Sequence, residues 1–158
     1  MNRTINGKAS IWFIMGLLLG MSLVSCVGGG RIPMADKPLS PAALIGYCRL
    51  PASCSEALAC DGRVVTVAGH LNPRNIFNKQ RYPHLPYEKF TLVGHDGHSI
   101  EVWPQALDNQ PIFNKLARCP SGRVVVTGRL KAVKRPSMKA CQMGVKVLID
   151  DASQIAFE

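Results

Sequence analysis

GRVVTVAGHL, residues 62–71, repeats with a period of two, which is the spacing of side chains along a β-strand. Val65, Val67 and Leu71 share one face of this strand with Gly69, and we expect that face to lie against the core. A glycine inside a strand is typical of a bulge or a sharp bend, because it has no side chain to pack. The stretch therefore predicts a bent first strand over 64–71.

A second stretch, GRVVVTGRL at residues 122–130, resembles the first. Each stretch comes shortly after a cysteine, opens on Gly-Arg-Val-Val and has a leucine two residues after its last glycine. The likeness is short. We interpret it as two strands with equivalent corners in the fold rather than as a repeat of a whole unit.

Alternation and turn residues predict the other elements. His95-Asp96-Gly97-His98 separates two alternating segments, and Asp-Gly in that place is typical of a hairpin. Ser40-Pro41 and Asn109 with Pro111 are typical of helix starts. In chain order the predicted elements are helical turns over 41–60, strands over 64–71, 89–94, 99–103, 123–130 and 145–149, a helix between the third and fourth strands, and a last short pairing over 152–157.

Three meandering strands, a helix and two further strands resemble the OB-fold, a five-stranded Greek-key barrel. The resemblance covers about Gly62 to Ile149 and implies a mainly β domain. An SH3-like barrel or a small sandwich is the alternative, and the helix between strands three and four argues against both. We expect a short N-terminal helical cover over 41–61 and an OB-like barrel domain over 62–158.

The N-terminus carries a second resemblance. Arg3 and Lys8 precede an apolar run over 11–24, which is the order of a secretory signal. The run leads into Leu23-Val24-Ser25-Cys26, which resembles the lipobox of bacterial prolipoproteins. The resemblance implies a signal peptide over 1–25, cleavage after Ser25, and lipidation of Cys26 on its thiol and on the new amino terminus, with acyl chains such as palmitate.

Lipidation of Cys26 would anchor the domain to a membrane. Each buried methylene of an acyl chain contributes about 0.8 kcal/mol, so several chains hold a protein firmly. Residues 26–40 contain three consecutive glycines and two prolines, and they predict a tether. The alternative is an uncleaved signal anchor, but the apolar run is shorter than the ~20 residues that span a bilayer. Val27 stands where inner-membrane lipoproteins of enterobacteria have aspartate, so the resemblance implies the outer membrane, facing the periplasm, rather than the inner membrane.

Five further cysteines are Cys48, Cys54, Cys60, Cys119 and Cys141. An exported protein meets an oxidising compartment, where cysteines pair and an odd number leaves one thiol over. No Cys-x-x-Cys pair is present, so disulfides are favoured over a zinc site. The OB-like order implies that a strand about 27 Å long separates Cys119 from Cys141, too far for a bridge. We expect Cys60–Cys141 and Cys48–Cys54 bridges, with Cys119 left over.

The formal charge of the chain is +9, and removal of Arg3 and Lys8 with the signal lowers it by two to +7. Anionic lipid headgroups, nucleic acid, an acidic protein and an anionic glycan all fit this charge. OB-folds bind through the loops after strands one and four, and both predicted loops here, 72–87 and 131–142, are basic. The candidate ligand-binding residues are Arg74, Lys79, Arg81, Tyr82, Tyr87, Lys131, Lys134, Arg135 and Lys139.

Cations interleaved with rings are what a groove for single-stranded nucleic acid needs. The alternative is a loop whose rings, Phe77 among them, pack on the barrel and whose lysines are solvated. An exported protein also rarely meets cytoplasmic nucleic acid.

No catalytic constellation is present. The chain lacks Gly-x-Ser-x-Gly, His-Glu-x-x-His and a phosphate loop, and no two acidic residues pair as acid and base. His95 and His98 flank a turn without a third ligand, so we interpret them as turn residues rather than as a metal site. Trp103, before Pro104, is interpreted as a rim or core residue. We predict no metal, no cofactor and no enzymatic activity.

The sequence as a whole predicts a membrane-anchored envelope lipoprotein with a non-catalytic, OB-like binding or assembly module and an envelope protein as partner. The alternative is a binder of single-stranded nucleic acid or another polyanion, such as an anionic glycan, through the two basic loops.

Overall fold

The computed structural model describes residues 37–49, 57–119, 122–136 and 141–158. This part of the chain is mainly β, with one six-stranded mixed sheet and two α-helices. The elements are α1 (Pro41–Cys48), β1 (Val64–Leu71), η1 (Pro73–Asn75), β2 (Phe90–Val93), β3 (Ser99–Pro104), α2 (Gln110–Ala117), β4 (Arg123–Pro136), β5 (Cys141–Ile149), η2 (Ala152–Gln154) and β6 (Ile155–Phe157). The predicted second helical turn lies largely outside the described residues, and residues 57–60 are not helical.

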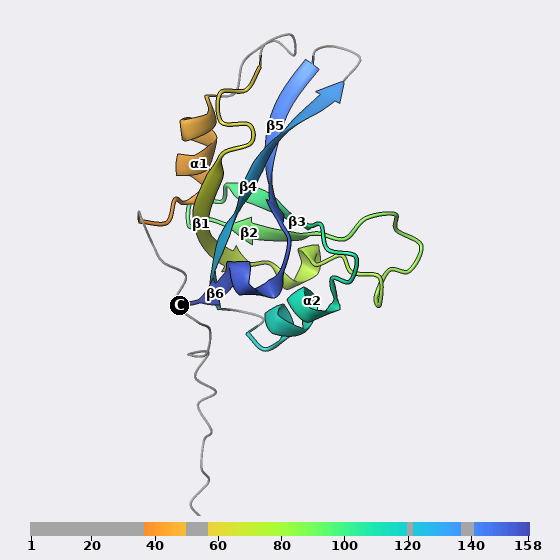
Figure 1. The fold of residues 1–158 in the computed structure, drawn as a ribbon. Helices are drawn as coiled ribbons and strands as arrows, with labels where there is room; N and C mark the ends of the chain where they lie inside the picture. The colour runs from red at the N-terminus through yellow and green to blue at the C-terminus, as the bar shows by residue number, and fades with distance from the viewer. Residues whose placement is uncertain (1–36, 50–56, 120–121, 137–140) are drawn as a thin grey trace, which may run out of the picture.

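The first five strands close into a ring (Figure 1). β1 pairs antiparallel with β2, and β2 pairs antiparallel with β3. β3 runs parallel to β5, β5 runs antiparallel to β4, and β4 returns to β1. This order, with α2 between β3 and β4, confirms an OB-like arrangement. The sheet is not a simple five-stranded barrel, because β6 adds a sixth strand beside β4.

The two similar stretches form equivalent corners of the ring. The ladder of β1 with β4 runs from Val64 to His70, and Gly69 is its last residue but one. His70 also begins the ladder of β1 with β2. Gly128 lies at the same point of β4, and Arg129 begins the ladder with β5. A β-carbon on Gly69 would lie 3.0 Å from the carbonyl oxygen of Val93. Both glycines therefore sit where a second strand approaches too closely for a side chain.

β4 is longer than predicted. It continues past Leu130 to Pro136 and pairs with β5 as far as Cys141. The predicted basic loop over 131–142 is therefore largely a strand pair, and we call residues 131–136 and 141–145 the basic arm. Lysine is somewhat depleted in strands, and the run of Lys131, Lys134 and Arg135 therefore indicates a loop rather than a strand to a pattern-based prediction.

The core fills the inside of the ring, and the helices cover its two sides. Ser40 caps α1 by accepting a hydrogen bond from the backbone N–H of Ala43 at 3.1 Å. The fully buried side chains include Leu44, Val67, Phe90, Leu92, Val102, Ile112, Leu116, Val124, Val126, Leu130, Val147, Ile149 and Ile155. Ile112 and Leu116 of α2, together with Phe113, are buried on one side of that helix as predicted.

The predicted tether extends into the domain at its end. The backbone N–H of Leu39 donates to the carbonyl of Thr66 at 2.9 Å, and the N–H of Ala68 donates to the carbonyl of Leu39 at 2.9 Å. Leu39 also packs against the core. The last residues of the predicted tether, 37–40, therefore belong to the folded domain, where Leu39 pairs with β1.

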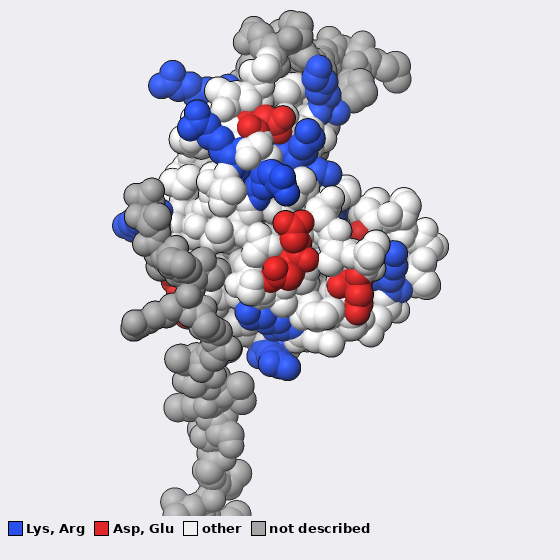
Figure 2. All heavy atoms as spheres, in the orientation of Figure 1, with Lys and Arg blue, Asp and Glu red and all other residues white. Residues whose placement is uncertain are grey.

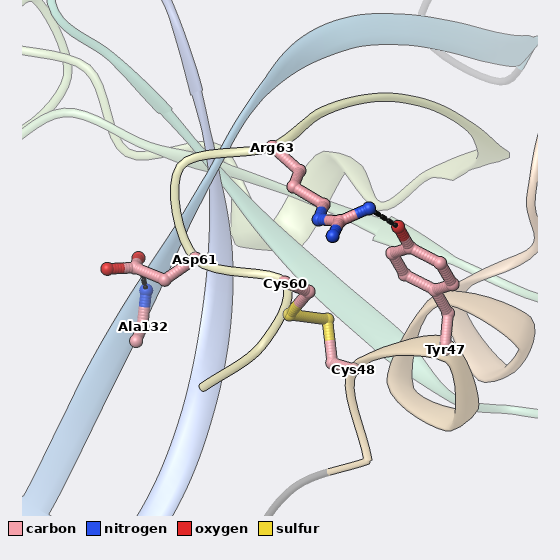
Figure 3. Close-up of a disulfide and its surroundings, with 6 residues drawn as sticks. All are labelled: Tyr47, Cys48, Cys60, Asp61, Arg63 and Ala132. Atoms are coloured by element: carbon pink, nitrogen blue, oxygen red, sulfur yellow. Dashed lines mark hydrogen bonds between the residues drawn. A yellow bond between two sulfur atoms is a disulfide. The ribbon is translucent and has the colours of Figure 1, made fainter. Parts of the chain in front are cut away.

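A disulfide joins α1 to the segment before β1, and it corrects the predicted pairing (Figure 3). Cys48 is bonded to Cys60, so the predicted Cys48–Cys54 and Cys60–Cys141 bridges are wrong. Cys119 is disulfide-bonded as well, and the prediction that it is left over is also wrong. Cys54 lies outside the described residues. The predicted Cys60–Cys141 bridge does not form because β4 is longer than expected: Cys141 lies at the far end of the basic arm, opposite Pro136.

Asp61 follows the disulfide and contacts the base of the arm. Its carboxylate accepts a hydrogen bond from the backbone N–H of Ala132 at 2.7 Å and lies 3.7 Å from the Lys131 ammonium group (Figure 3 shows the first contact). On the other side of the disulfide, Arg63 donates to the Tyr47 hydroxyl at 3.3 Å.

Candidate anion-binding pocket

A pocket of about 310 Å³ lies where the loop between β1 and β2 meets β3 and β5. Its wall combines three lysine or glutamate side chains, two aromatic rings and two amides. The lining residues are Lys79, Pro86, Tyr87, Glu88, Trp103, Pro104, Gln105, Asn109 and Lys146. Four separate parts of the chain supply them, so only the folded sheet brings them together.

A group of charged and aromatic side chains forms one side of the pocket. We call it the aromatic–lysine cluster, and its members are Phe77, Tyr87, Lys89, Glu101, Trp103 and Lys146. The Lys89 ammonium group donates to the Glu101 carboxylate at 2.7 Å, and the Trp103 indole N–H donates to the same carboxylate at 2.9 Å. Lys89 also lies within 5.6 Å of the centres of three rings, those of Phe77, Tyr87 and Trp103. The charge of Lys89 is therefore satisfied inside the cluster.

Lys146 is the cluster's less compensated cation. Its ammonium nitrogen lies 3.6 Å from the centre of the Trp103 ring, and in the sheet it stands beside Glu101 on one side and Lys131 on the other. Burial lowers the pKa of Lys146 below its usual 10.5, and the nearby Lys89 and Lys131 lower it further, although Glu101 opposes them. An anion beside Lys146 would stabilise the charged form of this lysine.

Hydrogen bonds hold the rest of the wall in place. The Glu88 carboxylate accepts one bond from the backbone N–H of Lys79 at 2.7 Å and another from the Asn109 side-chain amide at 2.8 Å. The Asn109 Oδ1 atom is buried and has no partner among the described residues. A water or a ligand hydroxyl would satisfy such an acceptor. Gln105 donates to the carbonyl groups of Trp103 and Pro104, at 3.3 and 3.0 Å.

The structure brings only part of the predicted loop 72–87 to the pocket. Lys79 and Tyr87 line it, and Tyr87 packs on Trp103 with ring centres 5.4 Å apart. Arg81 lies over Tyr82 instead, and Tyr82 packs on Phe77. Arg74 belongs to η1, which Asn72 caps, and it does not line the pocket.

The second predicted set lies on the basic arm rather than in a loop. Lys131, Lys134 and Arg135 are residues of β4, and Lys139 lies outside the described residues. Figure 2 shows basic side chains gathered over the upper part of the molecule, where Figure 1 places the extended ends of β4 and β5. Lys131 is the member of this set that stands directly opposite Lys146 in the sheet.

Sequence reasoning missed four residues of the cluster. Lys89, Glu101 and Lys146 were not proposed, and Trp103 was interpreted as a rim or core residue; in the structure it is half-buried and lines the pocket. The alternation of Glu101 and Trp103 with the buried Val102 places both on the outer face of β3, and that signal was available in the sequence. The sequence pattern does not show that Lys146 lies close to Trp103, because this contact depends on the parallel pairing of β3 with β5.

The histidines do not form a metal site with three ligands. His98 donates its backbone N–H to the Asp96 carboxylate at 3.0 Å, as expected of a turn. His95 packs against His70 of β1 with ring centres 4.9 Å apart. Across the described parts of the chain, no group of three or more histidine, cysteine or acidic side chains is placed to hold a metal ion. None of the helices in those parts is long and apolar enough to cross a membrane.

No family model matches the chain, and no curated protein matches it. Among solved structures, it resembles a mitochondrial single-stranded DNA-binding protein from S. cerevisiae, at 14% identity and a TM-score of 0.43, over 61% of this chain and 94% of that one. An aspartyl tRNA synthetase from Entamoeba histolytica matches at 18% identity and a TM-score of 0.39, over 63% of this chain and 19% of the synthetase. A DUF3299 family protein from Pseudomonas aeruginosa matches at 18% identity and a TM-score of 0.33, over 85% and 93%. At these TM-scores the likeness establishes neither a shared family nor a shared function.

Proposed function

We propose that this chain is an envelope lipoprotein, anchored through Cys26, whose β domain is a non-catalytic binding module for an anionic ligand. The observation that supports binding is the position of Lys146, a partly buried cation that lines a pocket of about 310 Å³. Lys79 is a second lysine among the residues that line the pocket. The support for anchoring is the lipobox-like Leu23-Val24-Ser25-Cys26, which precedes the described residues.

The proposed ligand carries a carboxylate or phosphate group. Such a group would accept charge-assisted hydrogen bonds from Lys79 and Lys146. The Trp103 ring is already in contact with Lys146 and with the Tyr87 ring, so the cluster does not offer a free ring on which a base could stack. This favours an anionic glycan over a single-stranded nucleic acid as the ligand, with an envelope protein as a further partner of the anchored domain.

Trp103 provides a direct test of binding. The chain has two tryptophans, and the other, Trp12, belongs to the expected signal peptide. A fragment over 27–158 therefore reports on the pocket alone through Trp103 fluorescence. We expect an acidic oligosaccharide such as oligoglucuronate to change that fluorescence saturably, and Lys146→Gln to weaken binding by about tenfold to a hundredfold, because a hydrogen bond to a charged group contributes about 1.5–3 kcal/mol.

Lys134→Gln is the matched control, since it removes the same charge from the arm and not from the pocket. It should leave the affinity unchanged within about twofold. Because the pKa of Lys146 is lowered, binding should also weaken with rising pH before 10.5, where a free lysine loses its charge. Equal loss in both variants would show that net charge, and not the pocket, binds the probe.

Cys26→Ala tests the anchor. Without the thiol there is no site for the lipid, so we expect an unprocessed precursor that metabolic fatty-acid labelling does not detect. The wild-type chain, expressed alongside, should be labelled and should fractionate with the envelope membranes. Labelling of the variant at the wild-type level would contradict the lipoprotein proposal.

A single-stranded nucleic acid binder remains the alternative function. The observation in its favour is that Lys79 and Tyr87 of the predicted loop do line the pocket. The same fluorescence titration with an oligo(dT) separates the two ligands. Binding of oligo(dT) that is stronger than binding of the acidic sugar and falls steeply with salt would favour the alternative.

A further inference from the structure

The basic arm carries charge that the pocket does not use. No acidic residue lies between Asp108 and Asp150 in the sequence, whereas the arm includes two lysines and an arginine, which are Lys131, Lys134 and Arg135. The side chains of Lys131 and Lys134 are exposed. Lys131 lies 3.7 Å from Asp61, but both side chains are over a third exposed, and such pairs offset little charge. Lys134 makes no ion pair within the described part of the chain.

The arm extends beyond the ring. The ladder of β4 with β1 ends at Arg129, and the ladder of β5 with β3 begins at Lys146. Beyond these points β4 and β5 pair with each other as far as Pro136 and Cys141. Six residues of strand reach about 20 Å. Ala132, Met143 and Val145 keep the arm packed against the core, while the side chains of Lys131 and Lys134 remain exposed. Lysines on free strand edges also prevent edge-to-edge association, and the test below separates that role from binding.

We propose that the basic arm docks onto the anionic headgroups of a membrane leaflet and so orients the tethered domain. The inference goes beyond the pocket but rests on the proposed anchoring, which brings a leaflet within reach. The ten residues between Cys26 and Lys37 can span at most about 36 Å, so the domain stays within that distance of its anchor.

The chemistry of the arm fits headgroups better than other anionic partners. Its residues include no aromatic ring, so it offers no platform for stacked bases and no aromatic anchor for a protein interface. Diffuse positive charge is what a surface of anionic lipids recognises, and each lysine near it raises the binding constant about fivefold.

Vesicle co-sedimentation tests the inference with the lipid-free fragment 27–158. All residues of the described core lie between Leu39 and Phe157, so this fragment contains the whole of it. We expect binding to phosphatidylcholine vesicles that contain about a third phosphatidylglycerol, little binding to pure phosphatidylcholine, and loss of binding at high salt. The double variant Lys131→Gln/Lys134→Gln should weaken binding by at least about tenfold.

The control is the double variant Arg74→Gln/Arg118→Gln, which removes the same number of exposed charges from the loop after β1 and from the end of α2. It should bind the anionic vesicles as the wild type does. Equal weakening in both double variants, or equal binding to neutral vesicles, would overturn the inference, as would binding to oligo(dT) without binding to vesicles. Lys146→Gln reports on the pocket and labelling of Cys26 reports on the anchor, so failure of either proposed function is seen separately.

Discussion

At Gly128 the absence of a side chain allows β4 and β5 to approach each other. A β-carbon there would lie within 3.0 Å of the Leu148 carbonyl oxygen and of the side chains of Val147 and Ile149. One of these three neighbours is backbone, and the other two are fully buried side chains of the core. The local sequence that surrounds this glycine is repeated around Gly69, where the approach is less close.

We predict that Gly128→Ala lowers the free energy of unfolding by about 2–3 kcal/mol, because the added methyl group must displace packed atoms of β5. Gly69→Ala should cost less, since its nearest neighbour would be at 3.0 Å. Urea unfolding followed by circular dichroism measures both. Gly46→Ala is the control: Gly46 lies in α1 with open space around it, and alanine should raise stability by about 0.5–1 kcal/mol.

Asp151 gives a pH-dependent prediction at the same scale. Its carboxylate accepts a hydrogen bond from the backbone N–H of Ser153 at 2.6 Å and caps η2, and hydrogen bonds from Ser153 hold its pKa below the usual 3.8. A carboxylate with a lowered folded-state pKa stabilises the fold above its unfolded-state pKa, and this contribution is lost as the pH falls through the folded-state value. The stabilisation is thus present at pH 7, and it is lost progressively as the pH falls below about 4 towards the lowered folded-state pKa.

We therefore expect Asp151→Ala to lower stability at pH 7 by about 1 kcal/mol, the usual contribution of a cap, and to have less effect at pH 3. Urea unfolding at the two pH values measures the difference. Asp150→Ala is the comparison, because Asp150 makes only a 3.9 Å contact with Arg129 and both side chains are exposed. An equal pH dependence in the two variants would contradict the assigned role of the cap.

At the scale of the element, α1 is attached to the domain by packing and by one covalent bond. Leu44 is fully buried, and Cys48 and Cys60 are 1% and 2% exposed. The helix is only two turns long, and a helix of that length has little stability of its own. The disulfide therefore keeps α1 in contact with β1 and holds Asp61 against β4.

Replacing both cysteines, as Cys48→Ala/Cys60→Ala, should lower the free energy of unfolding by about 3 kcal/mol, the loop-closure value for a bridge with 12 residues of separation. Thermal and urea unfolding measure the loss. Peptide mapping under non-reducing conditions should recover a peptide that contains both residues. Recovery of Cys60 joined to Cys141 instead would contradict the pairing.

The length of β4 determines both the basic arm and the position of Cys141. The alternation over 123–130 was enough to predict its first half, which β1 and β6 complete. Its second half contains Lys131, Lys134 and Arg135, whose charges are uncommon in strands. In the described residues β5 is the strand that pairs with this half, and the pairing places Cys141 opposite Pro136.

At the scale of the whole molecule, the described core needs no residue before Leu39. We predict that a fragment over 37–158 unfolds in one cooperative transition with the same midpoint as the fragment over 27–158, because both contain all of the buried side chains in the described part of the chain. Calorimetry and circular dichroism should give coincident curves. A broad or two-step transition of the shorter fragment would show that residues 27–36 stabilise the fold.

The sequence by itself determined the local elements of this protein: the strands with a period of two, the hairpin turn at Asp96-Gly97, the buried side of α2 and the two glycine corners. These depend on residues that are close along the chain, so the pattern is visible without the fold. Tertiary structure alone decided the Cys48–Cys60 bridge, the basic arm and the aromatic–lysine cluster. Each of them joins residues that are distant or differently patterned in the sequence, and the sheet sets their separation: Lys146 reaches Trp103 only because β5 lies parallel to β3.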